Sequence, residues 1–538
     1  MARYVHERFP FARPPELDGQ SSRVPILIVG AGPVGLALAI DLALAGVKSV
    51  VLDDNDAVAV GSRAICWSKR SLEIFDRLGV AQRMVAKGVT WKVGRLFHRD
   101  RQVYAFDLAT DADHKHPPFV NLQQYYVEDY LLARARDFPH LIDMRFKSRV
   151  VNVRPGRSEA TAVVETPAGN YEIEGEWLVA CDGVRSTVRD ALDLSFEGQA
   201  FDERFLITDV TMRADGPPER WFWFEPPFHD GQSALLHKQP DDIWRIDLQL
   251  GPEADPEHER RPDVIGPRIR AIVGDRPFEI EWSSVYTFQC RRLASFVHGR
   301  VLFAGDAAHI VSPFGARGGN GGIQDADNLA WKLAAVVEGR APPQLIASYD
   351  EERGRGADEN ILNSARATSF MTPKSRMERT LREEVLAMAA TDPFARRLVN
   401  SGRLSEPCSL AGLSLQSDDD DGFEGGLVPG SPCRDAPVRD RDGQPQWLLE
   451  HLGGSFVLMC FGSAPDVPDG VRVLVVDEGS TFPSPDLVDG DGLVRARYGW
   501  QPGSAYLIRP DQHVAARFAS PTRMGVEAAL ARALGKQP

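Results

Sequence analysis

The chain has 538 residues, of which 43% are hydrophobic and 26% are charged, and its formal net charge is -14. An acidic excess of this kind disfavours nucleic acids and anionic membrane surfaces as partners, because both carry negative charge themselves. The length predicts two to four domains.

The first predicted elements form a βαβ unit. An apolar strand covers Val24–Gly30, a helical pattern follows at once, and a second strand covers Ser49–Asp54. Two strands joined by a helix are typical of parallel pairing, because the helix carries the chain back to the edge where the first strand began. We therefore expect a parallel sheet near the N-terminus.

The turn between this strand and helix carries the motif GAGPVG, which fits G-x-G-x-x-G. Gly30 permits a tight turn, Gly32 lets a pyrophosphate approach the backbone, and Gly35 lets the helix pack closely on the strand. Pro33 completes the predicted cofactor-binding residues of the turn. The second strand ends near Asp53, whose carboxylate can accept hydrogen bonds from a ribose diol. These features predict a dinucleotide site; the alternative is a glycine-rich turn with Asp53 merely solvated.

Two later strands also end in acidic motifs. The strand Trp177–Gly183 ends in an Asp-Gly pair at Asp182, and the strand Arg300–Asp306 ends in a Gly-Asp pair at Asp306. Between them, residues 200–290 contain short alternating runs that are dense in Trp and Phe. These runs predict an antiparallel sheet.

The rest of the chain is first helical and then mixed. Helical periodicity continues from Ala326 to about Ala395. The segment Leu413–Pro432 is rich in Asp, Gly and Pro, which predicts a linker or exposed loop. Strand-like runs beyond it predict a separate small α/β domain.

Together, the three nucleotide motifs resemble those of one flavoprotein family. The G-x-G-x-x-G turn, the D-G motif at Asp182 and the G-D motif at Asp306 stand at separations similar to those of the group A flavoprotein aromatic hydroxylases. This is the family of para-hydroxybenzoate, phenol and 3-(3-hydroxyphenyl)propionate hydroxylases. The segment Gln124–Asp129 is similar to the family's Q-x-x-x-E segment. The resemblance covers roughly residues 24–355 and implies FAD as cofactor and NADH or NADPH as co-substrate.

The resemblance also implies individual cofactor contacts. Asp306 would hold the ribityl hydroxyls of FAD, and Asp182 would lie in the segment that touches both FAD and the nicotinamide donor. Arg63 and Gln124 would contact the diphosphate or the ribityl chain. For these last two residues the alternatives are a surface charge and a polar contact in the core.

A glycine-rich loop, Gly315–Gly322, follows Pro313. Backbone amides at the start of the next helix would point at the pyrimidine edge of the isoalloxazine, and Gly318, Gly319 and Asn320 of the loop are predicted cofactor-binding residues. Reduced flavin is anionic there, and free amides together with the helix dipole would stabilise that charge by ~1–2 kcal/mol. Side chains larger than glycine would collide with the ring.

The helix after this loop is expected from about Ile323, with Asp325 and Asn328 as polar groups at its start. His309 precedes the loop, and a histidine that packs against the loop is favoured there over a catalytic one.

The presence of a single nucleotide fingerprint argues against one class of flavoenzymes. A flavin disulfide reductase needs a second nucleotide fingerprint and a redox-active cysteine pair, and the sequence has neither. In the family that the chain resembles, NAD(P)H reduces FAD and leaves. Dioxygen then forms a flavin hydroperoxide, and an oxygen atom passes to an electron-rich ring. The protein excludes water, orients the ring and helps to deprotonate a phenol.

One strand pattern bears on the substrate. In the segment DIWRIDLQL apolar and polar residues alternate, so a strand would have one apolar face and one polar face. Taken alone, this alternation favours a strand that is half exposed to solvent. The apolar positions are Trp244, Ile246 and Leu248, and the polar positions are Arg245, Asp247 and Gln249.

The resemblance implies a different role, in which this strand covers the active site. Arg245 would approach the flavin, and Asp247 would point towards the substrate, where the best-known member of the family has a tyrosine. Asp247 would repel a benzoate-type carboxylate, which puts such a ligand in doubt. We hypothesise that Asp247, with His237 on a neighbouring strand, binds or deprotonates a hydroxyl or amine. Pro313 completes the predicted catalytic residues.

The C-terminal segment is similar to the thioredoxin-like domain of phenol hydroxylase relatives. The stretches GSPCRDAPV and GGSFVLMCFG carry this likeness. Cys433 and Cys460 stand far apart in sequence, so no C-x-x-C redox motif is present. Pro510 and Asp511 predict the turn of a hairpin. We expect the domain to brace the fold or to form part of a homodimer interface.

Cysteines and apolar stretches bear on the cell compartment. The six cysteines include no C-x-x-C pair, which favours reduced thiols over disulfides or a zinc site. Residues 1–23 are charged and rich in proline, without the apolar core of a signal peptide. The most apolar stretch, Leu36–Val47, is too short to cross a bilayer. We therefore expect a cytoplasmic protein with no metal and no membrane contact.

The sequence thus predicts an α/β protein: an FAD-dependent, NAD(P)H-consuming monooxygenase of a phenolic or related aromatic compound. Two alternatives remain: an FAD monooxygenase of a polycyclic, antibiotic-like compound, and a flavin-binding protein without turnover whose tail is an interaction module. The predicted parts are a tail (1–23), a Rossmann-like FAD-binding domain (24–200 and 290–370), an interleaved substrate-binding sheet (201–289), helices and a linker (371–425), and a thioredoxin-like domain (426–538).

Overall fold

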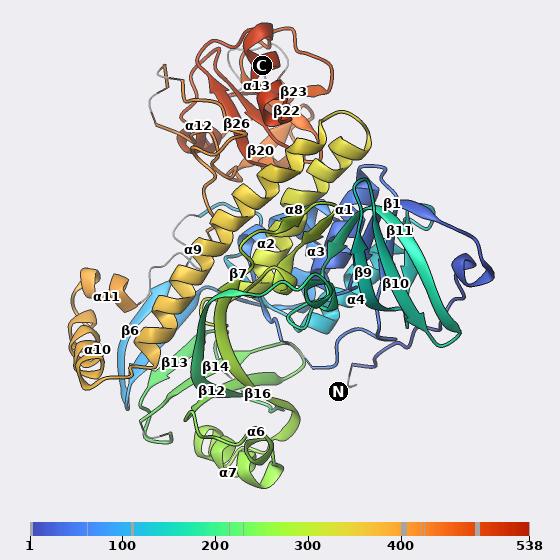
Figure 1. The fold of residues 1–538 in the computed structure, drawn as a ribbon. Coiled ribbons are helices and arrows are strands. Elements are labelled where there is room, and N and C mark those ends of the chain that lie inside the picture. The colour runs from blue at the N-terminus through green and yellow to red at the C-terminus, as the bar shows by residue number, and fades with distance from the viewer. Residues whose placement is uncertain are drawn as a thin grey trace.

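The structure is a computed structural model that describes residues 4–61, 63–108, 112–214, 216–229, 231–399, 406–420, 422–423, 425–478 and 485–536. These residues form three large sheets, and long helices run between them (Figure 1). The C-terminal sheet lies at one end of the molecule and the central sheet at the other, with the helix α9 (Ala347–Met371) running between them.

The N-terminal sheet contains the predicted βαβ unit. Its strands are β1 (Arg23–Val29), β2 (Ser49–Leu52), β8 (Ile142–Arg145), β9 (Arg149–Pro155), β10 (Ala160–Thr166), β11 (Gly169–Ala180), β17 (Val297–His298) and β18 (Val301–Phe303). The order is β17-β18-β11-β1-β2-β8, with β10 and β9 continuing from β11. β1 pairs in parallel with both β2 and β11, so the predicted parallel sheet is confirmed.

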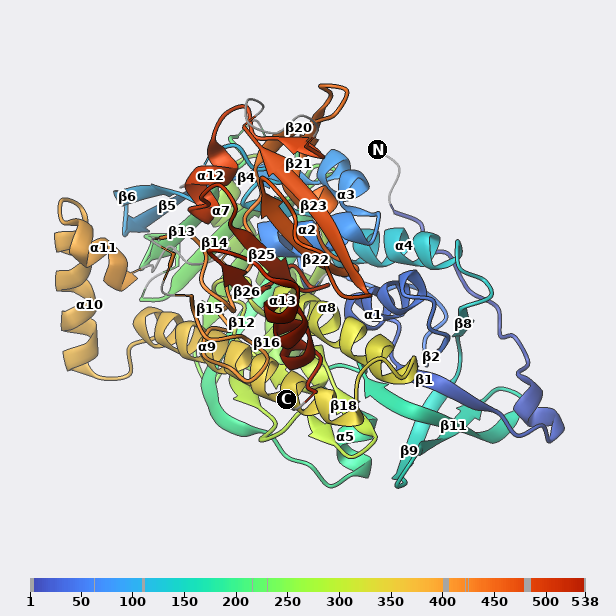
Figure 2. The same cartoon turned by 90° about the horizontal axis from the view of Figure 1, so that it is seen from above.

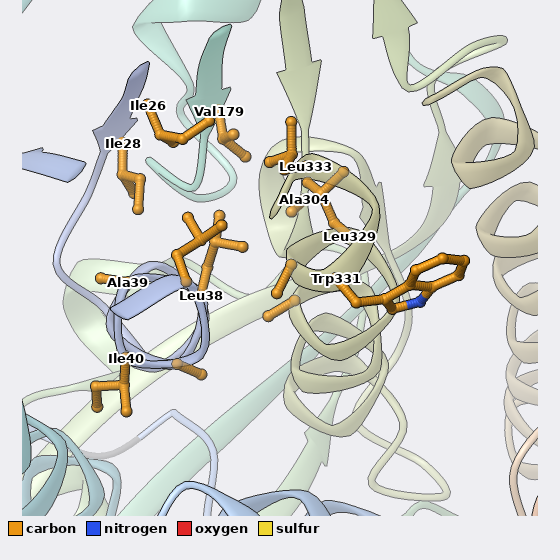
Figure 3. Close-up of a cluster of buried hydrophobic side chains, with 14 of the residues drawn as sticks. Ile26, Ile28, Leu38, Ala39, Ile40, Val179, Ala304, Leu329, Trp331 and Leu333 are labelled. Carbon is orange, nitrogen blue, oxygen red and sulfur yellow. The ribbon is translucent and has the colours of Figure 1, made fainter. Parts of the chain in front are cut away.

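The core of this region lies between β1 and two helices (Figure 3). β1 is apolar from Val24 onward, which is typical of a parallel strand that is buried on both faces, and its Ile26 and Ile28 are fully buried. α1 (Pro33–Leu44) packs against α8 (Gly318–Val337), and Leu38 and Leu329 meet in the same core cluster. The packing of β1, α1 and α8 therefore fixes the position of the turn before α1.

The start of α8 differs from the sequence prediction. The helix begins at Gly318 and not near Ile323. The reason is packing: a Cβ at Gly322 would lie 2.6 Å from the side chain of Val34, so this glycine is needed inside the helix for its approach to α1. Asp325 and Asn328 are consequently buried within the helix, and their expected place at its start is wrong.

The central sheet confirms the predicted antiparallel region. Its strands are β5 (Val93–His98), β6 (Arg101–Asp107), β12 (Glu197–Thr211), β13 (Arg220–Phe224), β14 (Ser233–Lys238), β15 (Ile243–Leu250), β16 (Glu279–Arg292) and β19 (His309–Ile310). The order is β19-β16-β12-β15-β14-β13-β5-β6, and every pair is antiparallel except β13 with β5. Two of its strands, β5 and β6, come from the chain before the region in which the sheet was predicted.

One face of the central sheet is covered by α6 (Pro256–Glu259) and α7 (Pro262–Val273) (Figure 1). Trp244, Ile246 and Leu248 of β15 pack with Ile265 and Ile269 of α7 in one buried cluster. The strand's polar face is therefore left on the opposite side of the sheet.

Smaller elements connect these layers. They are the sheet β3-β7-β4 with strands β3 (Cys66–Ser68), β4 (Val89–Trp91) and β7 (Phe119–Asn121), and the helices α2 (Lys69–Arg77), α3 (Ala81–Lys87), α4 (Gln124–Ala135), α5 (Thr187–Ala191), α10 (Arg376–Ala389) and α11 (Pro393–Val399). The helices α8 to α11 account for the helical periodicity that the sequence showed.

The C-terminal sheet has seven strands in the order β21-β20-β24-β23-β22-β25-β26. They are β20 (Pro437–Asp440), β21 (Pro445–Trp447), β22 (Phe456–Phe461), β23 (Val471–Asp477), β24 (Leu487–Val488), β25 (Ala505–Ile508) and β26 (Val514–Phe518), with the helices α12 (Leu493–Tyr498) and α13 (Arg523–Ala533). β25 and β26 form the predicted hairpin around Pro510 and Asp511.

The segment predicted as a linker, Leu413–Pro432, packs against the protein where it is described. Leu415 is 3% exposed and Gln416 is 2% exposed, and Gln416 donates a hydrogen bond to Glu352 of α9. Its polar composition therefore serves buried contacts as well as turns, and the expectation of an exposed loop is wrong for these residues.

Buried charges join the C-terminal sheet to the rest of the molecule. Arg509, at the end of β25, donates to both carboxylate oxygens of Glu352, at 2.5 and 2.9 Å. Lys332 of α8 binds the same carboxylate at 2.7 Å, and Arg509 also pairs with Asp511. All four side chains are fully buried. This cluster, which we call the interface ion network, connects the hairpin to α8 and α9. Figure 2 shows β25 and β26 lying over these two helices.

Within the described ranges, no helix is long and apolar enough to cross a membrane. The same residues contain no group of three or more His, Cys, Asp or Glu side chains that could hold a metal ion.

Candidate functional site

A cavity of about 720 Å³ lies between the N-terminal sheet, the central sheet and the start of α8. Residues that follow the carboxyl ends of β1, β2, β11 and β18 line one side, which is where open α/β sheets bind their ligands. Of the sixteen predicted site residues, all except Gly35 line the cavity. They are Gly30, Gly32, Pro33, Asp53, Arg63, Gln124, Asp182, His237, Arg245, Asp247, Asp306, Pro313, Gly318, Gly319 and Asn320.

The glycine-rich turn has the geometry that its motif predicts. Gly30 has φ +104°, and a Cβ there would lie 2.5 Å from the carbonyl oxygen of Cys181. A Cβ at Gly35 would lie 2.0 Å from the carbonyl oxygen of Gly30. Gly32 caps α1 and would have no protein atom within 4 Å of a Cβ. Two of the glycines therefore serve packing, whereas the space beside Gly32 is free for a ligand.

The three acidic motif residues face the cavity but differ in their hydrogen-bond partners. Asp53 accepts hydrogen bonds from the amides of Ala31, at 2.6 Å, and Asn55, at 2.8 Å. Oδ1 of Asp182 is buried and finds no hydrogen-bond partner among the described residues. Asp306 opens onto the cavity although it lies deep in the protein, and burial raises the pKa of its carboxyl. Asp182 and Asp306 therefore have acceptor capacity left for a ligand.

Arg63 and Gln124 lie together on the cavity wall. The side-chain oxygen of Gln124 accepts from the amide of Ala64 at 3.2 Å, and its nitrogen donates to Glu128 at 2.8 Å. Glu128 in turn accepts from the amide of Ala59 at 2.6 Å, and burial raises its pKa to about 7. Gln124 and Glu128 thus hold the loop from which Arg63 reaches the cavity.

At the start of α8, Gly318 and Gly319 are the first two helical residues, so their amides lack partners within the helix. Asn320 differs, because its side chain is engaged by the protein. Its oxygen accepts from the amide of Ser68 at 2.9 Å, and its nitrogen donates to the carbonyl of Cys66 at 2.9 Å. The Asn320 side chain therefore fixes the helix start against β3.

His309 is buried behind the loop, away from the cavity. Its Nε2 lies 2.6 Å from Oδ2 of Asp325, and Asp325 also accepts from Arg353 at 2.6 Å and from the amide of Gly305 at 2.9 Å. The neighbouring imidazole and guanidinium hold the pKa of Asp325 well below its usual range, against the effect of burial. His309 is thus a packing histidine, as the sequence favoured.

The polar face of β15 forms the opposite wall, and the half-solvated alternative is wrong. Arg245 is 3% exposed and Asp247 is 9% exposed. Two nitrogens of Arg245 bind the carboxylate of Asp209 at 2.9 and 2.8 Å, and a third donates to the carbonyl of Arg63 at 3.3 Å. Trp282 lies 5.7 Å from the guanidinium. Arg245 therefore joins the central sheet to the loop of Arg63.

Asp247 is buried and has an unsatisfied oxygen. Its Oδ1 finds no hydrogen-bond partner in the described part of the chain. Burial raises its pKa to about 6, although Arg245 opposes the shift. A carboxyl group with this pKa is ionised at neutral pH and can accept a proton.

His237 lies in the same wall but is not basic. Burial lowers its pKa well below the usual value, and the positive charges of Arg220 and Arg245 lower it further. Its Nδ1 lies 4.0 Å from Sγ of Cys66. The imidazole is therefore neutral at working pH and acts only as a hydrogen-bonding group.

Sequence reasoning missed Arg220, which also lines the cavity. It is the first residue of β13, a strand whose other members are tryptophan and phenylalanine. Period-two alternation along β13 was the available signal, because it places Arg220 on one face with Phe222 and Phe224. An apolar wall faces these polar groups, and its members include Tyr286, Phe288 and Phe314.

The residues present fit FAD. Its adenosine and diphosphate need a glycine turn, a carboxylate and a helix N-terminus, and the cavity offers each of them beside Gly32 and Asp53. Its ribityl hydroxyls need hydrogen-bond acceptors, which Asp306 supplies, and its flavin ring needs small residues, which the glycines of α8 supply. The buried unpaired oxygen of Asp182 is accounted for by a polar ligand.

Comparison with known proteins decides the family. Residues 23–364 match the family model described as FAD binding domain. This chain belongs to the group A flavoprotein aromatic hydroxylases. It is therefore an FAD-dependent monooxygenase, and members of this family typically take NADH or NADPH as co-substrate.

Relatives match nearly the full length of this flavoprotein hydroxylase. It is 31% identical to a 6-methylpretetramide 4-monooxygenase of Streptomyces rimosus, over 94% of this chain and 92% of the relative. It is 28% identical to a 3-(3-hydroxy-phenyl)propionate/3-hydroxycinnamic acid hydroxylase of Mycolicibacterium smegmatis, over 91% and 90%. Among solved structures, the flavin-dependent monooxygenase PieE has a TM-score of 0.78 at 20% identity, over 96% of this chain and 100% of that one. This last likeness concerns the fold.

Substitutions at Gly35 and Gly32 should distinguish a glycine needed for packing from a glycine needed for cofactor binding. We expect Gly35→Ala to destabilise the fold even without FAD, by about 1–3 kcal/mol, because its methyl group meets backbone at 2.0 Å. Gly32→Ala should leave the melting temperature of the apoprotein unchanged but lower its flavin content, because only a ligand would occupy that space. Thermal melts of apoprotein and flavin absorbance per chain measure both effects. Equal melting losses in the two variants would contradict this division.

Proposed function

We propose that this flavoprotein hydroxylates a phenolic ring, with NADH or NADPH as reductant and dioxygen as oxidant. The observation that carries this proposal is the buried carboxyl of Asp247, which has an unsatisfied oxygen and a pKa raised to about 6. A phenol becomes a stronger electron donor when it loses its proton, and a carboxylate at this position can accept that proton.

The proposed cofactor contacts follow the cavity from one end to the other. The turn at Gly30, Gly32 and Pro33 would hold the diphosphate of FAD, with Asp53 at the ribose and Arg63 and Gln124 beside the phosphates or ribityl chain. Asp306 would bind the ribityl hydroxyls, and Asp182 would lie in the segment that touches both FAD and the nicotinamide donor. The amides of Gly318, Gly319 and Asn320 would face the pyrimidine end.

When bound, FAD supplies the redox chemistry that activates oxygen. The chain itself orients the ring and manages the proton. Asp247 would accept the phenolic proton, and the neutral His237 would hold the same oxygen by a hydrogen bond. Arg245, fixed by Asp209, would keep the loop of Arg63 in place. Pro313 and the aromatic wall would shield the reacting ring from water.

A second candidate is a polycyclic substrate. The relative at 31% identity is named for action on 6-methylpretetramide, and the other for hydroxyphenylpropionate and hydroxycinnamic acid. The same site residues would serve either substrate. Both relatives are named as oxygenases or hydroxylases, which favours an enzyme over a flavin-binding protein without turnover.

The test is substrate-stimulated NAD(P)H oxidation by purified holoprotein. We expect phenols of one size class to accelerate the oxidation at least tenfold and to gain one oxygen atom by mass. A panel should pair hydroxyphenylpropionate and hydroxycinnamate with fused-ring phenols, because the class that is turned over separates the two candidates. If no aromatic compound accelerates the oxidation or gains oxygen, the proposed function is wrong.

We retain the predicted division into parts as a proposal, with a thioredoxin-like C-terminal domain that lacks C-x-x-C. Three observations support it: β22 and β23 are parallel, β25 and β26 form a hairpin antiparallel to β22, and α13 follows.

The six cysteines are free, which supports a reducing cytoplasmic location.

A homodimer is proposed through α10. Met377 is 81% exposed, Leu381 62% and Met388 50%, and the three lie on one face of the helix. Arg376 near one end and Glu383 nearer the other would pair across a two-fold axis if two copies packed antiparallel. Sedimentation of the wild type and of Leu381→Asp tests this; a monomeric wild type would exclude it.

A further inference from the structure

Arg220 belongs to a row of side chains that crosses the central sheet. It pairs with His237 of β14, and His237 pairs with Arg245 of β15. Residues directly opposite each other on antiparallel strands share a face of the sheet. All three side chains line the cavity, on the wall that also carries Asp247.

Of the two arginines in this row, only one has a counterion. Arg245 has its counterion, because Asp209 binds two of its nitrogens. His237 carries no charge at working pH. Arg220 forms no side-chain hydrogen bond and no ion pair with any described residue, and Asp247 acts on it only at longer range.

Arg220 also differs from the other unpaired arginines of the cavity. Within the described chain, Arg63, Arg149 and Arg185 line the cavity without an ion pair, but all three are exposed to water. Arg220 is half-buried in the wall of the cavity, and burial lowers its pKa. A guanidinium removed from water without a counterion is unfavourable, and this cost is offset when an anion binds beside it.

We propose that Arg220 binds an anionic oxygen of the aromatic substrate, either a carboxylate or a phenolate, and so selects acidic aromatic compounds over neutral ones. This inference rests on the proposed function, because it concerns the substrate of that same cavity. The guanidinium presents two parallel N–H groups, which suit a carboxylate, and one of them suffices for a phenolate.

Arg220 makes the cavity compatible with an acidic substrate. Asp247 alone would repel a carboxylate, which is why a benzoate-type ligand was in doubt. Arg220 on the same wall supplies the opposite charge, and Asp247 itself is neutral below a pH of about 6. The pair can therefore separate two functions, with Arg220 binding an anion and Asp247 receiving a proton.

The test measures ligand binding to the holoenzyme through the change in flavin absorbance, without NAD(P)H. The probes are 3-(3-hydroxyphenyl)propionate, its primary amide and 3-methylphenol. If Arg220 binds the carboxylate, Arg220→Gln should raise the Kd of the acid about 10- to 100-fold and leave the amide unchanged. If it binds the phenolate, all three phenols should weaken, most strongly at pH values where they ionise. Arg220→Lys should recover part of the affinity in either case.

The outcome that overturns the proposal is an unchanged Kd for the acid and for both neutral phenols in Arg220→Gln. Arg101→Gln, at an exposed arginine of β6 outside the cavity, is the matched control and should alter none of these constants. Binding without turnover in the wild type would count against the proposed function but would leave the selection by Arg220 measurable.

A stability measurement covers the case in which none of these phenols binds. Removing an unpaired, half-buried charge should raise the melting temperature of the ligand-free holoenzyme in Arg220→Gln. Sodium benzoate, as a simple carboxylate probe, should raise the melting temperature of the wild type but not of this variant. A lower melting temperature in Arg220→Gln, or an equal response of both proteins to benzoate, would show that Arg220 is a structural residue and would overturn the proposal.

Discussion

Replacing Glu352 with Gln is expected to lower the free energy of unfolding by about 3–5 kcal/mol, which is the usual effect of breaking a buried ion pair. Glu352 is fully buried and is bound by both Arg509 and Lys332. The substitution keeps the shape of the side chain but leaves these two cations without their shared counterion. Urea and thermal unfolding, followed by tryptophan fluorescence, measure the loss.

The pH dependence of this loss identifies its cause. Burial lowers the pKa of Lys332 to about 8, even though Glu352 raises it. In Glu352→Gln that support disappears and the pKa falls further, so holding the ammonium charged at pH 7 becomes more costly. As pH rises through about 8, Lys332 becomes neutral in both proteins, and the difference in stability should shrink.

Glu351→Gln is the matched control, because Glu351 is the neighbouring residue of α9 and is exposed. It should change stability by no more than about 0.5 kcal/mol. An equal effect of the two substitutions would mean that the interface ion network does not hold the C-terminal sheet to α8 and α9.

Structural features that depend on residues close together in the sequence were predicted correctly. The turn Gly30–Gly35 follows from sterics between residues five apart, and the structure places a Cβ of Gly35 only 2.0 Å from Gly30. The hairpin at Pro510 and Asp511 likewise depends on local turn chemistry. The acids at the ends of β2, β11 and β18 were predictable because parallel strands bring their carboxyl ends to one edge.

Features that depend on distant residues were not predicted. The start of α8 is set by Val34 of another helix, which requires a glycine at 322, so a glycine run that looks like a loop becomes helix. Asn328 and Asp325 look like helix-start residues, yet their partners lie 24 and 28 positions away in α9. Arg220 was missed because its significance lies in a missing partner, and a sequence does not show which charges remain unpaired.

Asp247→Asn is expected to lower the rate of aromatic hydroxylation by about 10²- to 10⁴-fold, the range found when a positioned acid–base group is removed. In the wild type, product formation should rise with pH through about 6, as the carboxyl loses its proton, and then level off. The variant should lack this rise, because an amide does not titrate. The rate of product formation per enzyme, measured at saturating substrate across pH 5–8, records both effects.

The same substitution should stabilise the protein, which separates loss of catalysis from damage to the fold. Burial raises the pKa of Asp247 from 3.8 to about 6, so the folded state holds its proton more tightly than the unfolded state does. The stability that this carboxyl confers is therefore present at low pH and is lost as pH rises through about 6. Near pH 8 the ionised Asp247 destabilises the fold by about 3 kcal/mol, which Asn would not. Asp275→Asn, at an exposed aspartate just after α7, should change neither activity nor stability. If Asp247→Asn lost activity and stability together, Asp247 would be holding the sheet, and the proton would leave the substrate by another route.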